Sequence, residues 1–233
     1  MLKLILSILV VSSLLNADTK EALEAFKKKD YVTAFKLYEE SAKAGDTTAQ
    51  NALSYLYFNG IGVDKDKAKG IAWLEKSAHG MDSTAQYDLG MMYLVGNNVK
   101  QDTTLAFTWL DSSSDLGNAK AQYNLSLMYY RGDGVDENVT KSVALLEKAA
   151  IGGHVEAQKN VGRIYMQLLK FDKAAQWLEL NAYEGDVESY YLLAEIYCTQ
   201  EKFIKAKKWA QMSKDAGNAD AELLWLKYNL EKY

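Results

Sequence analysis

Hydrophobic and polar residues follow one another in a pattern that repeats every 36 residues between Ala49 and Gly153. The segments that start at Ala49, Ala85 and Ala121 read A-Q-N-A-L-S-Y-L-Y-F-N-G, A-Q-Y-D-L-G-M-M-Y-L-V-G and A-Q-Y-N-L-S-L-M-Y-Y-R-G. A period of this length is typical of a solenoid, in which each unit buries its apolar face only against its neighbours. The same offset relates Tyr57, Tyr93 and Tyr129, then Gly60, Gly96 and Gly132, and then Val63, Val99 and Val135.

Within each repeat, the apolar positions predict two helices. Ala85, Leu89 and Met92 recur at the three-to-four spacing of a helix with one buried side, which predicts a first helix over residues 84–95. Gly96 follows it, where a left-handed residue can end the helix. The loop then reads G-x-G-V or G-N-N-V, with Asn98 in place of glycine at a positive φ. A second helix is predicted over residues 102–116.

Beyond Gly153 the period shortens to 32 residues, because Tyr165 recurs at Tyr197 and the glycine loop is missing. Residues 18–45 are predicted to form a capping hairpin, since residues 31–44 match the second half of a repeat. We therefore expect one continuous array without a domain boundary. Its parts are the hairpin 18–45, three 36-residue repeats (46–153), two 32-residue repeats (154–218) and a single capping helix (219–233).

The first 17 residues differ from the repeats. Lys3 precedes an apolar stretch from Leu4 to Leu15, and the small residue Ala17 stands before Asp18. This order is typical of a secretory signal peptide cleaved after Ala17. A retained membrane anchor is the alternative, but the stretch is shorter than a span of roughly 20 residues. We expect an exported protein, periplasmic or secreted.

Charge and cysteine usage narrow the function classes. The net charge is -4, and acidic and basic residues are interspersed, so the sequence favours neither nucleic acid nor an anionic membrane surface as a partner. Cys198 is the single cysteine and cannot form an internal disulfide. It stands where other repeats have Phe58 or Leu94, which predicts a buried apolar role rather than a reactive thiol.

No catalytic or metal-binding motif is complete in the sequence. The chain has no S-x-x-K pair and no phosphate-binding glycine loop, and its two histidines, His79 and His154, are too few for a zinc hydrolase. Both are expected at the ends of second helices. We predict no catalytic residues, metal or cofactor. Asn138 begins an Asn-Val-Thr sequon in an expected exposed loop, so it is a candidate glycosylation site.

The pattern A-Q-Y-x-L-G-x-x-Y-x-x-G-x-x-V-x-x-D-x-x-x-A-x-x-W is most complete between Ala85 and Trp109 and resembles Sel1-like repeats. The 32-residue units are more similar to tetratricopeptide repeats. The resemblance covers nearly all of residues 31–233. It implies an all-α fold, a right-handed α-solenoid of helix-turn-helix repeats whose first helices line a concave face. It also implies a role in binding other proteins.

The resemblance assigns ligand-binding positions on that concave face. By analogy with tetratricopeptide repeats, one row would contain aromatic and cationic residues and the next row would change from apolar to charged. The alternative is that part of the tyrosine row packs between adjacent first helices. The first row is Asn51, Tyr87, Tyr123, Lys159 and Tyr191, and the second is Tyr55, Met91, Leu127, Arg163 and Glu195.

We therefore expect a scaffold that binds a protein, a peptide or a cell-wall component related to peptidoglycan. Tyr87, Tyr123 and Met91 would bury the ligand, and Lys159 and Arg163 would pair with an acidic group. The alternative is β-lactamase or penicillin-binding activity, by analogy with the cysteine-rich Sel1 proteins of Helicobacter. This chain lacks the cysteine pairs of that branch.

Overall fold

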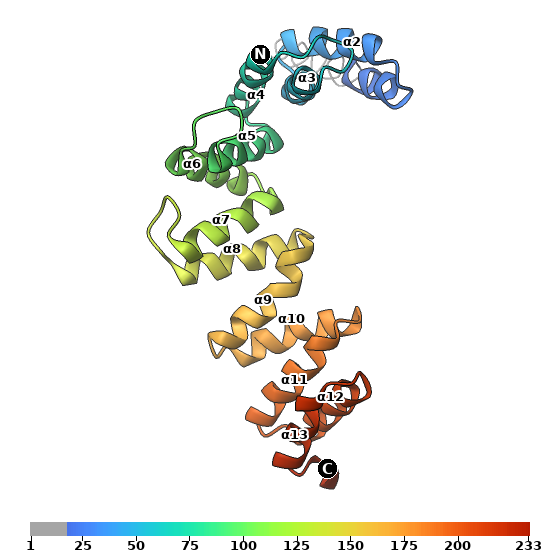
Figure 1. The fold of residues 1–233 in the computed structure, drawn as a ribbon, viewed down its shortest axis with the longest axis vertical. Coiled ribbons are helices and arrows are strands. Elements are labelled where there is room, and N and C mark those ends of the chain that lie inside the picture. Colours follow the sequence, from blue (N-terminus) through green and yellow to red (C-terminus); the bar gives the residue numbers. More distant parts are fainter. Residues whose placement is uncertain (1–17) are drawn as a thin grey trace, which may run out of the picture. The chain divides into compact units, whose positions relative to one another are not determined.

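The computed structural model describes residues 18–233, and within this range every regular element is a helix. Helices follow one another in pairs joined by short loops (Figure 1). This confirms the all-α helix-turn-helix prediction. After a helix at residues 18–27, the elements are α2 (Tyr31–Lys43), α3 (Thr47–Asn59), α4 (Lys67–His79), α5 (Ser83–Val95), α6 (Thr103–Asp115), α7 (Ala119–Arg131), α8 (Val139–Ile151), α9 (Val155–Gln167), α10 (Phe171–Tyr183), α11 (Val187–Thr199), α12 (Phe203–Asp215), α13 (Ala219–Lys227) and the 3₁₀ helix η1 (Leu230–Lys232).

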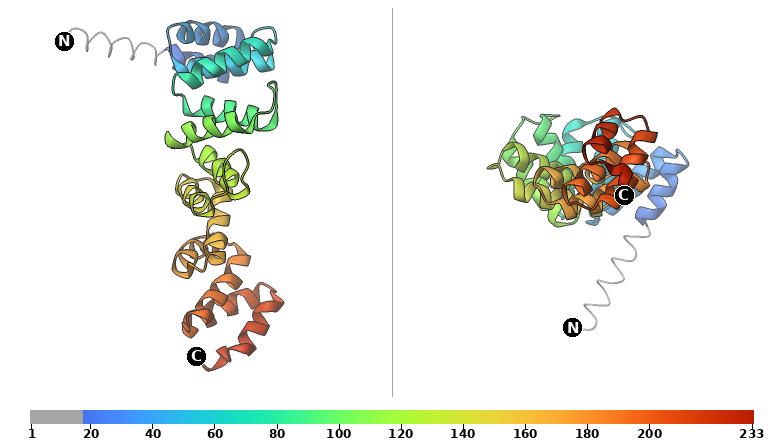
Figure 2. Two further views of the ribbon diagram at one scale, coloured as in Figure 1. Left: turned by 90° about the vertical axis from the view of Figure 1, so that its left-hand side faces the viewer. Right: turned by 90° about the horizontal axis from the view of Figure 1, so that it is seen from below.

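The chain divides into two compact units, one ending at Glu137 and the other running from Asn138 to Tyr233. Unit 1 contains α2 to α7, and unit 2 contains α8 to α13 with η1 (Figure 2). The division falls in the loop between α7 and α8, inside the third 36-residue repeat, where the sequence predicted no boundary. Since each repeat buries its apolar face only against its neighbours, no central core holds all repeats in one unit.

Glycine ends the first helices as predicted. Gly60, Gly96 and Gly132 take φ values of 69°, 71° and 74°, and Asn98 takes 62° in the loop where other repeats have glycine. Gly62 also needs to lack a side chain, because a Cβ there would lie 2.1 Å from the Tyr31 carbonyl oxygen. The glycine loop therefore lies directly against the preceding second helix, α2.

The glutamine of each A-Q pair joins consecutive repeats. Its amide, buried in Gln50, Gln86 and Gln122 and half-buried in Gln158, reaches back to the last turn of the preceding second helix and donates a hydrogen bond to a backbone carbonyl. Since the alanine before it is fully buried in each case, the A-Q pair is a packing motif. The bonds are Gln50 to Ala42 (3.0 Å), Gln86 to Ala78 (3.1 Å) and Gln122 to Ser114 (3.3 Å) in unit 1, and Gln158 to Ala150 (3.1 Å) in unit 2.

The C-terminal segment differs from the predicted single helix. Helix α13 ends at Lys227, and Asn229 takes a left-handed φ of 49° that turns the chain into η1. This turn buries Leu230 and stacks Tyr233 on Phe203, with ring centroids 4.6 Å apart. The last residues therefore fold back onto α12 and cover it.

The predicted signal peptide, residues 1–17, lies outside the described residues. None of the helices in residues 18–233 combines the length and the hydrophobicity that a membrane span needs.

Candidate functional site

In unit 1 the predicted binding residues lie at equivalent positions of the first helices α3, α5 and α7. Tyr55 is 53 % exposed, and the remaining members are half-buried, so none is sealed from solvent. This accessibility is what a binding surface requires. We call this set, together with its helices, the first-helix surface of unit 1; it comprises Asn51, Tyr55, Tyr87, Met91, Tyr123 and Leu127.

A surface pocket of about 290 Å³ opens between α3 and α5 and brings three of these residues together. Asn51 and Tyr55 reach it from α3, and Met91 reaches it from α5. Most of its wall is apolar, but one carboxyl group, that of Asp88, also lines it. The other lining residues are Ser54, Phe58, Leu74, Met92, Val95 and Asn97.

Asp88 is the residue of this site that the sequence analysis did not single out. Burial raises the pKa of its carboxyl group, with Lys120 at longer range acting against the shift and Asp82 adding to it. Among residues 18–233, no lysine, arginine or histidine nitrogen lies within ion-pair distance of this carboxylate. The pocket therefore contains a partly desolvated acid without a close counter-ion.

The equivalent positions in the next two repeats show why Asp88 is unusual. Asn124 donates its side-chain amide to the Lys120 carbonyl at 2.9 Å, and Asn160 does the same to Glu156 at 2.8 Å. An ionised aspartate can only accept hydrogen bonds, so Asp88 cannot make this bond to the residue four positions earlier. The sequence signal for this exception was the D in A-Q-Y-D-L-G against the N in A-Q-Y-N-L-S.

Tyr87, Tyr123 and Leu127 lie outside that pocket. The Lys120 ammonium lies 6.0 Å from the centre of the Tyr87 ring, and burial, followed by the charge of Asp88, raises the pKa of the Tyr87 hydroxyl. Tyr87 is thus partly packed between neighbouring first helices, as the alternative interpretation of the tyrosine row expected, while part of its surface stays accessible.

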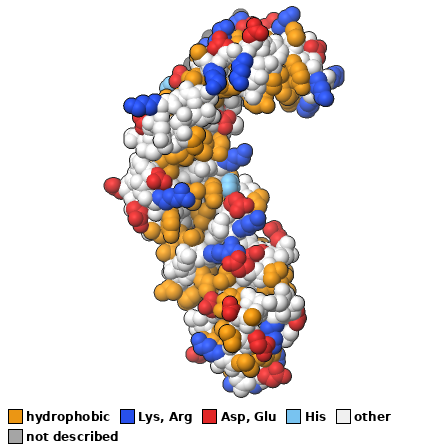
Figure 3. Space-filling model, in the orientation of Figure 1, with side chains coloured by type: hydrophobic (Ala, Val, Ile, Leu, Met, Phe, Trp, Pro, Cys, Tyr) orange, Lys and Arg blue, Asp and Glu red, His pale blue; other side chains and the backbone are white. Residues whose placement is uncertain are grey.

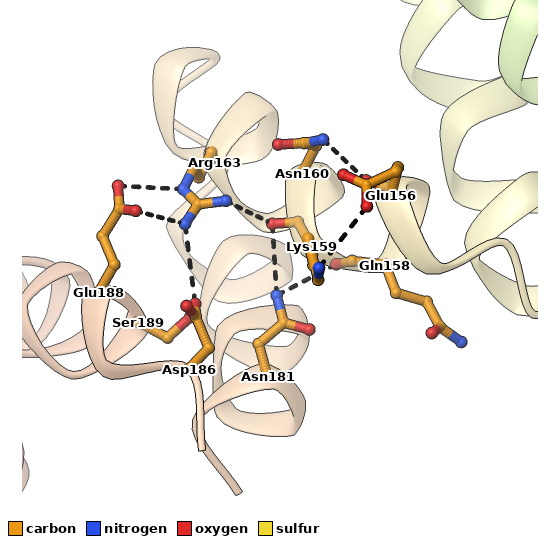
Figure 4. Close-up of polar contacts among 9 residues, drawn as sticks. All are labelled: Glu156, Gln158, Lys159, Asn160, Arg163, Asn181, Asp186, Glu188 and Ser189. Carbon is orange, nitrogen blue, oxygen red and sulfur yellow. Dashed lines mark hydrogen bonds and ion pairs between the residues drawn. The ribbon is translucent and has the colours of Figure 1, made fainter. Parts of the chain in front are cut away.

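In unit 2 the predicted cations already have partners within the chain. The Arg163 guanidinium on α9 donates to both carboxylate oxygens of Glu188 on α11, at 3.2 and 2.7 Å, and lies 3.7 Å from Asp186 (Figure 4). It also donates to the Lys159 carbonyl at 2.9 Å. The Lys159 ammonium lies 3.6 Å from Glu156. An acidic ligand would have to compete with these carboxylates.

A second surface pocket, of about 340 Å³, lies between α9 and α11 in unit 2. Of the predicted residues it contains Arg163, while Lys159, Tyr191 and Glu195 are not part of its lining. Burial, followed by the charge of Glu195, raises the pKa of the Tyr191 hydroxyl. The other lining residues are Met166, Gln167, Glu188 and Leu192.

The repeat signature decides the family. A sequence model of the Sel1 repeat matches residues 25–46, 47–80, 83–118, 119–154 and 187–218. The chain belongs to the Sel1 repeat family. The last matched segment is one of the two 32-residue units that resemble tetratricopeptide repeats, so a Sel1 repeat here does not require the glycine loop.

Solved structures agree on the fold of this Sel1 repeat protein. A Sel1 repeat protein from Oxalobacter formigenes is 27 % identical, with 87 % of this chain and 88 % of that chain covered and a TM-score of 0.66. A protective antigen of uropathogenic Escherichia coli strains, c5321, is 23 % identical, covers 93 % and 58 % of the two chains, and has a TM-score of 0.50. The latter likeness concerns the fold alone. No curated protein matches the sequence.

Helicobacter pylori cysteine rich protein B is 24 % identical over 60 % of this chain and 93 % of that chain, with a TM-score of 0.42. A likeness at this level says nothing about activity. In the described part of this Sel1 repeat protein, no group of three or more His, Cys, Asp and Glu side chains is arranged to hold a metal ion. Cys198 is buried, as predicted, and burial raises the pKa of its thiol to about 11.

Two of the residues singled out in the sequence, His154 and Asn138, cap helices in these Sel1 repeats. His79 is the last residue of α4, as expected, but His154 begins a first helix rather than ending a second one. Its Nδ1 accepts a hydrogen bond from the Ala157 backbone amide at 3.2 Å, so it caps α9. Asn138 likewise caps α8, where its side-chain oxygen accepts from the Lys141 amide at 2.9 Å. Its sequon therefore runs into the first turn of a helix.

Proposed function

We propose that this Sel1 repeat protein is a scaffold whose first-helix surface in unit 1 binds a peptide or an extended segment of a partner protein. Sel1 repeats typically mediate protein binding, which supports the general role. The observation that carries the specific proposal is the α3–α5 pocket, where the exposed Tyr55 and the half-buried Met91 meet.

The residue types of the pocket favour a peptide ligand. Tyrosine and methionine supply large contact areas that adapt to side chains, and such residues anchor many protein interfaces. The lining also includes Leu74, Met92 and Val95, whose apolar surfaces suit the side chains of a peptide better than the hydroxyl groups of a cell-wall glycan. Charged side chains of both signs are interspersed on the face drawn in Figure 3, so long-range charge attraction is not the main source of affinity.

Unit 2 contributes less than unit 1 to the proposed binding surface. Arg163 is paired with Glu188, and Lys159 lies close to Glu156. An acidic group of the partner could bind either cation only after its ion pair opens, so we assign these cations a secondary role. Tyr191 and Glu195 keep partial exposure on α11 and can extend the contact.

A random-peptide display selection on the chain from residue 18 onward tests the scaffold proposal. Tyr55→Ala combined with Met91→Ala should reduce the binding of the selected peptides by about tenfold or more, since each anchor typically contributes more than about 1 kcal/mol. Tyr183→Ala is the matched control, because Tyr183 is an exposed tyrosine (72 %) on the second helix α10. Selected peptides that bind the double variant as tightly as the wild type would refute the assignment of this surface.

We also propose that the protein is exported and that its mature chain begins at Asp18. The charge, apolar stretch and small residue of the first 17 residues support this. N-terminal sequencing of the protein recovered from a periplasmic extract tests the cleavage position. Recovery of the intact N-terminus from a membrane fraction would favour the retained anchor instead.

A further inference from the structure

Each unit has a pocket between neighbouring first helices, α3–α5 in unit 1 and α9–α11 in unit 2, and the two pockets differ in the charged side chains that line them. In unit 2 the α9–α11 pocket is lined by both members of an ion pair, Arg163 and Glu188. In unit 1 the position of Arg163 is taken by Tyr55 and that of Glu188 by Thr84, while the α3–α5 pocket has a different acid, Asp88, one turn further along the facing helix. The lining of the α3–α5 pocket therefore contains a carboxylate but no cationic side chain.

The acid in unit 1 is not satisfied by its own helix. Asn124 and Asn160, at the same position of later repeats, each donate to the backbone carbonyl four residues earlier, whereas an ionised Asp88 has no hydrogen to donate to the equivalent carbonyl. No basic nitrogen of the described chain lies within 4 Å of it. A partly buried acid of this kind gains most from a counter-ion that arrives together with a ligand.

The remaining walls suit a long basic side chain. Phe58, Met91 and Val95 offer apolar surface for the methylene groups of lysine or arginine, which bury their stems and keep the charged end near polar groups. The ring of Tyr55 can also attract a cation over its face. The pocket volume of about 290 Å³ is sufficient for one such side chain, not for a folded element.

We propose that the α3–α5 pocket binds a basic side chain, arginine or lysine, of the partner peptide, with Asp88 as its counter-ion and Tyr55 and Met91 packing against its stem. This inference rests on the proposed function, because it names the chemistry of the ligand at the same surface. An arginine bound there would form an arginine–carboxylate pair between two first helices, of the same kind as the pair that unit 2 contains within its own chain but with the acid at a different position of the repeat.

A titration with N-acetyl-arginine amide tests the pocket directly. Methionine methyl groups are labelled with carbon-13 in the full mature chain, and Met91 and Met92 serve as local reporters because both line the pocket. Saturable shifts of these two resonances are expected with the arginine probe, and not with N-acetyl-citrulline amide, its neutral analogue. Asp88→Asn should weaken binding by about tenfold or more.

Asp115→Asn is the matched control, since it removes an exposed carboxylate from α6 without touching the pocket. The other methionine resonances report whether each variant is folded. Equal shifts with citrulline, unchanged binding by Asp88→Asn, or no shift of Met91 and Met92 would each overturn the inference. Displayed peptides that need Tyr55 and Met91 but bind Asp88→Asn normally would overturn it while leaving the scaffold function intact.

Discussion

Arg163 on α9 and Glu188 on α11 form a two-point ion pair that joins the first helices of consecutive repeats. The guanidinium side chain is 27 % exposed and the carboxylate 64 % exposed. Arg163 therefore has Glu188 as a partner within the chain, in place of the acidic ligand that the sequence suggested for it. Asp186, at 3.7 Å, adds a second acid to the same guanidinium.

Removing this pair should have a small effect on stability. Because Glu188 is mostly exposed, we expect Arg163→Ala and Glu188→Gln each to lower the free energy of unfolding by about 1 kcal/mol or less. Urea denaturation of both variants and of the double variant gives the coupling energy between the two side chains. Lys159→Ala, which breaks an exposed pair within one helix, is the control and should change stability still less. Additive effects of the two substitutions would show that the pair contributes nothing.

Asp88→Asn should stabilise the protein near neutral pH. Asparagine can donate to the Thr84 carbonyl, as Asn124 and Asn160 do to theirs, and it carries no charge, so we expect a gain of about 1 kcal/mol. Urea denaturation of Asp88→Asn, with Asp115→Asn as the control, measures this gain in the free energy of unfolding.

The gain should depend on pH in a defined direction. Burial raises the pKa of Asp88 in the folded state, so the folded protein binds this proton more tightly than the unfolded chain does. The wild type therefore loses stability as the pH rises from the ordinary aspartate pKa through the raised one. The advantage of Asp88→Asn should appear above this window and shrink below it. A gain that is the same below and above this window would contradict the electrostatic part of this explanation.

Loss of the glutamine amide that joins two repeats should destabilise unit 1. Gln86→Ala removes the buried hydrogen bond to the Ala78 carbonyl, while that oxygen still accepts from the Met81 backbone amide, so the free energy of unfolding should fall by about 0.5–1.5 kcal/mol. Gln101→Ala is the matched control, because Gln101 also donates to a backbone carbonyl, that of Leu94, but in an exposed position. Equal losses in the two variants would show that burial of the bond is not what matters.

The sequence was sufficient to predict the helices because their signals are local. The apolar spacing around Leu89, the glycines after the first helices and Asn98 at a positive φ each act within a few residues, and the structure confirms them. The C-terminal segment differs from the prediction because its conformation depends on contacts with another helix and not on local signals. A helical apolar pattern continues to Leu230, but packing of that side chain and of Tyr233 against α12 favours a turn at Asn229.

The candidate site depended on contacts that the repeat pattern alone does not contain. The pattern identifies which positions are equivalent, and it places Tyr55 and Met91 on the same surface. It does not show that Glu188, 25 residues away, neutralises Arg163. Nor did periodicity emphasise Asp88, because a single Asp-for-Asn difference becomes informative only when the hydrogen bonds of Asn124 and Asn160 are known.

Cys198 should be inert towards thiol reagents in the folded protein. Its side chain is 2 % exposed, and burial, partly opposed by Lys227, raises the pKa of the thiol to about 11, so only about one molecule in ten thousand carries the reactive thiolate at neutral pH. We expect negligible reaction with an aromatic disulfide reagent under native conditions and complete reaction in urea. The control is Thr104→Cys combined with Cys198→Ser, which places the thiol on an exposed position of α6 and should react at once. Rapid native labelling of the wild type would mean that α11 opens far more often than its packing implies, because the thiol is reached only when this helix separates from its neighbours.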